Sequence, residues 1–135
     1  MKPNQTYTLA FSSCPNDTFI FKAIARQLID LHGYCFDIVL EDVETLNQKA
    51  AKGTYDITKL SFAAFGSLAQ TYALLRTGSA LGLGCGPLII SLPGRSLDDK
   101  TQPVIAVPGM GTTAYHLFRL YMDDTFIDMD ASIIP

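Results

Sequence analysis

The chain has 135 residues, of which 48% are hydrophobic and 17% are charged, and its formal net charge is −3. This length is sufficient for one domain with a buried core. The acidic balance, with Lys and Arg scattered along the chain, excludes an electrostatic basis for binding nucleic acid or an anionic membrane.

Neither a secretory leader nor a membrane-spanning segment is predicted. Residues 1–11 contain no long apolar run, and residues 80–92, the most apolar stretch, are too short and too rich in glycine to cross a bilayer. The three cysteines are widely spaced and form no Cys-x-x-Cys pair. We therefore expect reduced thiols in the cytoplasm and no structural zinc site.

The first predicted strand and helix follow one another directly. Residues 7–11 have the pattern of a strand, and residues 17–31 carry apolar side chains at helical spacing. Asn16 or Asp17 is the expected amino-terminal cap of this helix, and Gly33 is the expected stop signal.

The same alternation continues along the chain. Strands are predicted at residues 35–41, 55–60, 72–76, 87–92 and 104–107, and helices at residues 42–53, 62–70 and 112–122, the second of them capped by Ser61. This order predicts an α/β fold with a mainly parallel sheet flanked by helices.

The last apolar run, at residues 132–135, resembles a strand that has only just begun. A single trailing strand leaves the far side of the last strand–helix unit uncovered. We therefore expect that the chain is incomplete or that a partner, such as a second copy in a homo-oligomer, covers the exposed surface.

Three polar loops are the candidate site, at residues 12–18, 59–61 and 109–113. Each follows a predicted strand and leads into a helix amino terminus, where unpaired N–H groups and about half a positive charge are found. Because loops at the carboxyl ends of parallel strands meet at one edge of the sheet, these loops predict a site for a carboxylate or another electron-rich oxygen group.

Two interpretations stand for each polar side chain in these loops. Lys59 is either a solvated surface lysine or a contact for an anion, because an unpaired buried ammonium is costly. Ser61, Thr112 and Thr113 either cap helices alone or also donate to a ligand. Cys14 is expected to be a packed thiol, since no histidine near it in sequence supports a nucleophile.

Other chemistry is not indicated. The run Gly-Met-Gly-Thr-Thr lacks the ending and spacing of a phosphate-binding P-loop. His32 and His116 have no metal-ligand companion at useful spacing. Glu41 and Asp42 are adjacent carboxylates that fit helix-start charges better than an acid–base pair.

The stretches FSSCPNDTFIF, LEDVETLNQKA, YDITKLSFAAF, ALGLGCGPL and IAVPGMGTTAY together resemble the 1,4-dihydroxy-6-naphthoate synthase family of the futalosine route to menaquinone. The resemblance covers nearly the whole chain, although Ser13 stands where the family usually has proline. Members are similar to type II periplasmic binding proteins, with two α/β lobes around a ligand cleft, and are considerably longer. The resemblance implies that residues 1–92 are most of the first lobe and that residues 93–135 are the hinge and the beginning of the second.

This resemblance implies a lyase that converts cyclic dehypoxanthinyl futalosine to 1,4-dihydroxy-6-naphthoate, with no metal or organic cofactor. Carried over by motif, the residues implied to contact the carboxylated substrate are Lys59, Leu60, Ser61, Thr113 and Ala114, with Asn16 and Asn47 as polar positions facing the cleft.

The resemblance leaves the chain without a catalytic residue. The family's general-base histidine lies beyond residue 135, and neither His32 nor His116 matches it. A base must come within about 3 Å of the proton that it removes, so we expect the chain alone to be inactive. Two other functions remain open: a solute-binding module for a carboxylated ligand, which the missing leader disfavours, and the related chorismate dehydratase, which the motifs fit less well.

Overall fold

The computed structural model describes residues 5–95, 104–125 and 131–133. Its elements, in chain order, are β1 (Thr6–Phe11), α1 (Pro15–Ala25), β2 (Cys35–Leu40), α2 (Val43–Ala51), β3 (Ile57–Thr58), α3 (Phe62–Leu68), β4 (Ile105–Val107), α4 (Thr113–Thr125) and β5 (Ala131–Ile133). The fold is α/β with parallel strands, as predicted from the sequence.

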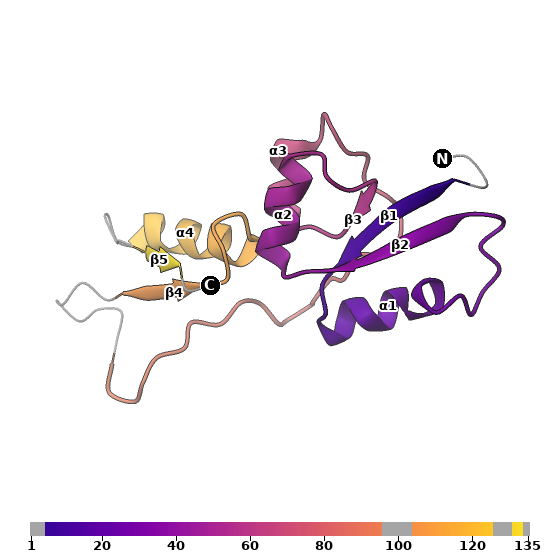
Figure 1. Cartoon of the computed structure of the whole chain (residues 1–135). Helices are drawn as coiled ribbons and strands as arrows, with labels where there is room; N and C mark the ends of the chain where they lie inside the picture. The colour runs from indigo at the N-terminus through magenta and orange to yellow at the C-terminus, as the bar shows by residue number, and fades with distance from the viewer. Residues whose placement is uncertain (1–4, 96–103, 126–130, 134–135) are drawn as a thin grey trace.

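The first sheet has the order β2-β1-β3, and all of its strands are parallel. The chain moves from β1 to β2 in one direction and then crosses back over β1 to reach β3. Because parallel crossovers are right-handed, opposite directions of travel place the connecting helices on opposite faces of the sheet. Figure 1 shows this arrangement, with α1 on one face and α2 and α3 on the other.

The core lies between β1 and α2. It is built from Ala10, Leu46 and Tyr55, with Val39 packed against them. On the opposite face, the ring of Phe21 from α1 stacks on Phe11 at the end of β1, with ring centroids 4.7 Å apart. The central strand is therefore covered on both faces, which the apolar run Leu9–Phe11 at its end predicts for a parallel sheet.

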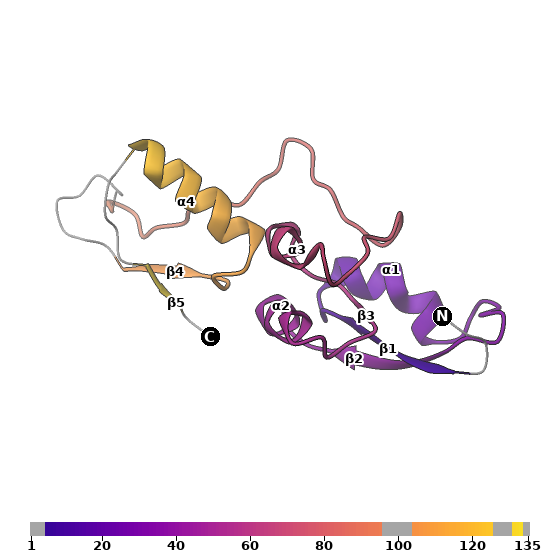
Figure 2. The ribbon, with the colours of Figure 1, turned by 90° about the horizontal axis from the view of Figure 1, so that it is seen from above.

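A second, two-stranded sheet pairs β4 with β5 in parallel, and α4 connects the two strands. The predicted helix at residues 112–122 and the strand in the last apolar run are thereby confirmed, with small shifts of their bounds. Seen from above in Figure 2, the amino-terminal end of α4 lies against α3. No helix among the described residues is long and apolar enough to cross a membrane.

The predicted bounds of the first helix are wrong at both ends. The helix begins at Pro15, with Cys14 rather than Asn16 or Asp17 at the cap position, because proline fits the first helical position. It ends at Ala25, because Gln27 takes a left-handed backbone conformation with φ of 51°.

The predictions of strands at residues 72–76 and 87–92 are wrong, because the structure describes both segments without strand pairing. The hydroxyl group of Tyr72 instead donates to the carbonyl oxygen of Tyr55, at 2.9 Å. Residues 79–92 run without regular structure between the two sheets, and Leu88 and Ile90 are 82% and 88% exposed. Apolar sequence alone does not make a strand, because backbone pairing requires a neighbouring strand, and none lies beside this run in the described residues.

Candidate functional site

The loop after β1 is organised by a buried carboxylate. Asp17, 6% exposed, accepts hydrogen bonds from the backbone N–H of Ser12 at 3.1 Å and from its hydroxyl group at 2.8 Å. The ammonium of Lys59 lies 3.4 Å from the other oxygen of Asp17 and donates to the carbonyl oxygen of Gly78 at 3.1 Å. The structure therefore places Lys59 neither free in solvent nor on a ligand: its ammonium pairs with a carboxylate of the same chain, and the predicted contact with a ligand anion stays a prediction. Two of the three predicted loops are thereby joined.

Ser61 is held by Asn47, which lies on α2 and is 5% exposed. The Asn47 carbonyl oxygen accepts from the N–H of Ser61 at 2.9 Å, and its amide nitrogen donates to the Ser61 hydroxyl oxygen at 3.1 Å. Ser61 occupies the cap position of α3, but its side chain makes no capping bond. Because this hydroxyl oxygen already accepts from Asn47, its proton is left to donate to another group.

The two threonines before and within α4 have different partners. Thr112 is buried; its hydroxyl group donates to the carbonyl oxygen of Gly109 at 2.7 Å and accepts from the N–H of Tyr115 at 3.2 Å, so it caps the helix. The hydroxyl oxygen of Thr113 instead accepts from the N–H of Ala63, at 3.2 Å. That bond brings the amino-terminal turns of α3 and α4 together.

Glu44, in the first turn of α2, is a contact that the sequence analysis missed. The backbone N–H of Gly111 donates to its carboxylate oxygens at 3.1 and 3.4 Å, and the Asn47 amide nitrogen lies 3.4 Å from the nearer one. Its spacing of three residues from Asn47 places both side chains on one face of α2, which was the available signal.

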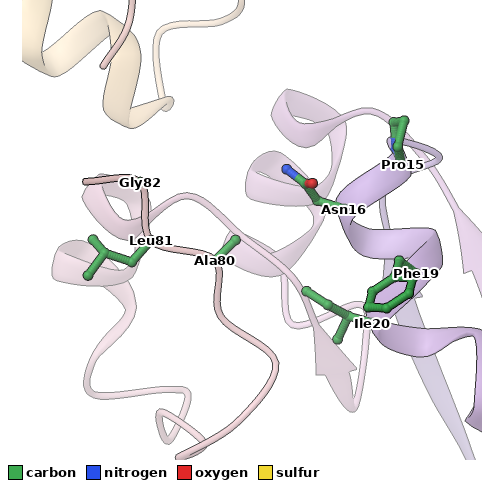
Figure 3. Close-up of a pocket in the computed structure, with 7 residues that line it drawn as sticks. All are labelled: Pro15, Asn16, Phe19, Ile20, Ala80, Leu81 and Gly82. Atoms are coloured by element: carbon green, nitrogen blue, oxygen red, sulfur yellow. The ribbon is translucent and has the colours of Figure 1, made fainter. Parts of the chain in front are cut away.

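Asn16 lines a separate, open pocket of about 840 Å³ beside the start of α1. Its other lining residues are Pro15, Phe19, Ile20, Ala80, Leu81 and Gly82. Figure 3 shows the side chains of α1 on one side of the pocket and residues 80–82 on the other, with the Asn16 amide as the polar side-chain group. The pocket adjoins the Lys59 contacts in sequence, since Asp17 follows Asn16 and Gly78 precedes Ala80 by two residues.

The structure thus brings the predicted residues into two groups. Lys59 and Asn16 lie with the loop after β1, whereas Asn47, Ser61 and Thr113 form one connected group. Leu60 and Ala114 are half-buried beside Lys59 and Thr113. No hydrogen bond or ion pair within the described ranges joins Lys59 or Asn16 directly to the turn at residues 109–114.

The adjacent carboxylates Glu41 and Asp42 have separate structural partners. Asp42 caps α2 by accepting from the N–H of Thr45 at 2.9 Å, and its hydrogen bonds with Thr45 lower its pKa. Glu41 binds the ammonium of Lys49 and the hydroxyl group of Tyr55, and the bond to Lys49, followed by that to Tyr55, lowers the pKa of Glu41. The interpretation of these carboxylates as helix-start charges therefore fits Asp42, whereas Glu41 forms an ion pair with Lys49.

The expectation of a packed thiol at Cys14 is wrong. Cys14 is exposed at the cap position of α1, in a loop that no other element covers among the described residues, and Cys35 and Cys85 are also free and exposed. His32 pairs with Asp30 at the surface. Within residues 5–95, 104–125 and 131–133, no group of His, Cys, Asp or Glu is arranged to hold a metal ion.

Comparison with known proteins gives a consistent result. A family profile described as menaquinone biosynthesis matches residues 7–135. A curated relative from Thermus thermophilus, named 1,4-dihydroxy-6-naphtoate synthase, is 46% identical over 114 residues, which are 84% of this chain and 40% of the relative. A relative of the same name from Streptomyces coelicolor is 40% identical over 121 residues, which are 89% of this chain and 42% of the relative.

A solved structure supports the fold. The crystal structure of a protein from Archaeoglobus fulgidus matches with a TM-score of 0.85 at 32% identity, over 96% of this chain and 46% of that chain. The chain spans about two-fifths of the length of the two curated relatives.

Proposed function

The chain belongs to the menaquinone biosynthesis family, and we propose that it carries part of the substrate site of a 1,4-dihydroxy-6-naphthoate synthase. The reaction proposed for the whole enzyme is the conversion of cyclic dehypoxanthinyl futalosine to 1,4-dihydroxy-6-naphthoate. The observation that carries the proposal is the joining of the Ser61 and Thr113 turns, through the hydrogen bond from Ala63 to Thr113, in a chain 46% identical to a protein of that name.

The donors at this junction suit a carboxylate. The N–H groups of Thr113 and Ala114 belong to the first turn of α4, where a helix offers no internal acceptor and its dipole favours negative charge. The Ser61 hydroxyl proton is available because its oxygen already accepts from Asn47. Lys59 supplies a cation, already partly neutralised by Asp17, at the neighbouring loop. Leu60 and Thr112 are proposed as flanking positions of the same site, and Asn16 as a polar position of the separate pocket beside α1.

A binding measurement on the 135-residue chain tests this proposal. We expect 1,4-dihydroxy-6-naphthoate to raise the melting temperature, and we expect Ser61→Ala and Thr113→Ala to remove most of that rise. Ser67→Ala, an exposed serine on the same helix as the Ser61 cap, is the matched control. A rise with chorismate alone would identify a chorismate dehydratase, and a rise with amino acids alone a solute-binding module.

Turnover is proposed to need more polypeptide than this chain provides. Among the described residues, His32 pairs with Asp30 and His116 packs edge-on against Tyr115, and neither matches the family's general base. We expect no turnover of cyclic dehypoxanthinyl futalosine by the purified chain, with the Thermus thermophilus relative as the positive control. Turnover by the chain alone would contradict this part of the proposal.

The exposed apolar residues at 83–92 are proposed to be covered in the working protein. The relatives' lengths favour further polypeptide as the cover, because three-fifths of the Thermus thermophilus protein lies outside the match, which spans 40% of it. Sedimentation distinguishes the two proposed covers: a concentration-dependent dimer would identify a second copy, whereas a monomer that binds an apolar dye supports further polypeptide.

A further inference from the structure

The carboxylate of Glu44 connects two parts of the chain that are far apart in sequence. It lies in the first turn of α2, yet it accepts from the backbone N–H of Gly111, in the turn before α4, at 3.1 Å. The two residues are 67 positions apart in the chain. This bond is therefore a tertiary contact between the first sheet's helices and α4.

The glycines of that turn fit around Glu44. A Cβ atom placed on Gly109 would lie 2.6 Å from the Cβ of Glu44. Gly109 also has a φ of +135°, a backbone conformation that residues with a side chain rarely adopt. A Cβ atom on Gly111 would lie 3.2 Å from a carboxylate oxygen of Glu44. The Gly-Met-Gly run, which is no P-loop, is thus explained by the close approach of one side chain to the backbone.

The same carboxylate is connected by hydrogen bonds to both parts of the proposed site, the Ser61 turn and the Thr113 turn. On one side it lies 3.4 Å from the amide nitrogen of Asn47, which binds Ser61 through both of its polar atoms. On the other side it holds Gly111, two residues before Thr113, whose hydroxyl oxygen accepts from Ala63. Removing Glu44 would leave the turn attached to α3 by the bond between Ala63 and Thr113.

We propose that Glu44 is a positioning residue that holds the turn at residues 109–113 against α2, so that Ser61 and Thr113 face one carboxylated ligand. This inference rests on the proposed function. The role requires an acceptor at the correct reach, because all three groups that Glu44 accepts from, the Gly111 N–H and the side-chain amides of Asn47 and Gln48, are neutral donors. Reach therefore matters more than charge.

Three substitutions at this position separate reach from charge. Glu44→Gln keeps the reach and loses the charge, Glu44→Asp keeps the charge and loses one methylene of reach, and Glu44→Ala loses both. We expect the affinity for 1,4-dihydroxy-6-naphthoate, measured by calorimetry, to fall about tenfold in Glu44→Asp and Glu44→Ala and by less than about threefold in Glu44→Gln, since one lost hydrogen bond of about 1.4 kcal/mol is a tenfold change. Asp37→Ala, which removes an exposed carboxylate from β2, should leave the affinity unchanged.

Amide hydrogen exchange supplies a readout that a general loss of stability would not produce. We expect faster exchange at Gly111 in Glu44→Asp and Glu44→Ala, with unchanged exchange at Leu9 in the central strand. If Glu44→Ala does not fold, Glu44→Asp makes the same comparison with a smaller change.

The outcomes are distinguishable. If the wild-type chain binds naphthoate and all three variants bind equally well, the role of Glu44 is overturned while the proposed function stands. A fall in affinity with Glu44→Gln and not with Glu44→Asp would overturn the positioning role in favour of charge. If the wild-type chain binds no naphthoate, the proposed function fails, and the ligand-positioning role falls with it, whatever the exchange at Gly111.

Discussion

The three-stranded sheet and the connection at residues 79–92 are both strongly apolar, yet only the sheet buries its side chains. Leu9, in the central strand, is 3% exposed, whereas Leu88 is 82% exposed. β1 has a strand on each edge and helices on each face. The connection has no paired strand among the described residues, and only residues 80–82 of it face a helix, across the open pocket beside α1. The difference shows that an apolar run predicts side chains that are stable only when buried. Whether they are buried is decided by pairing and packing with residues far away in the chain.

A core truncation should show this contrast most strongly. Leu46→Ala removes a side chain with no exposed surface, and we expect it to lower the free energy of unfolding by about 2–5 kcal/mol. Leu88→Ala makes the same chemical change in the connection and should cost less than about 0.5 kcal/mol. Urea denaturation of both variants makes the comparison, and equal costs would contradict it.

The junction between α2 and α3 should give the next largest effect. Asn47→Ala leaves the N–H group of Ser61 without its buried acceptor, and we expect a loss of about 1–3 kcal/mol in the free energy of unfolding. Lys52→Ala, at the exposed carboxyl-terminal end of the same helix, is the control and should stay within about 0.5 kcal/mol. A neutral result for Asn47→Ala would show that water replaces its hydrogen bonds.

The acid dependence of stability should come from the sheet region, because residues 79–92 contain no charged side chain. The bond to Lys49 lowers the pKa of Glu41 below its ordinary value of 4.5. A carboxyl group whose pKa is lower in the folded state stabilises it above the unfolded pKa, and this contribution is lost as the pH falls through the folded pKa. Melting temperatures should therefore fall below about pH 4.5, and Glu41→Gln should flatten that fall.

The control for this pH series is Asp37→Asn, since Asp37 is an exposed carboxylate on β2. Its melting curve should follow the wild type at every pH. An equally steep acid fall in Glu41→Gln would instead assign the effect to other carboxylates, such as Asp56, whose pKa is lowered by hydrogen bonds from the backbone N–H and hydroxyl group of Thr8.

The smallest effect on stability is expected in the connection itself. Leu88→Lys combined with Ile90→Lys should shift the melting temperature very little, because both side chains are already exposed. The same double variant should bind less of an apolar fluorescent dye than the wild type. Unchanged dye fluorescence would place the accessible apolar surface elsewhere in the molecule.

Local signals in the sequence predicted much of the fold. The apolar run of β1, the Asp42 cap and the Ser61 cap position were all identified correctly, because each depends on neighbouring residues. The early end of α1 at Ala25 could not be predicted, since glutamine at position 27 gives no signal for a left-handed backbone. The strand predicted at residues 87–92 failed because its partner is not encoded locally.

The candidate site was predictable to the level of its loops. Strand–helix junctions identified the loops that contain Lys59, Ser61 and Thr113, and the family resemblance added Asn47. The contacts of Asp17 and Glu44 join residues more than 40 positions apart, from Asp17 to Lys59 and from Glu44 to Gly111. The local spacing of Glu44 from Asn47 indicates a shared helix face, but no local pattern identifies these distant partners. Whether these loops bind a naphthoate stays a prediction.

The order β2-β1-β3 also constrains how the protein is made. β1, the middle strand of the sheet, is synthesised before both of its partners, and one of its edges stays open until Thr58 has been synthesised. A nascent chain paused before that point would present the apolar β1 to other chains. We therefore expect slow synthesis between β1 and β3 to lower the yield of folded protein, because the open edge of β1 can pair with other chains.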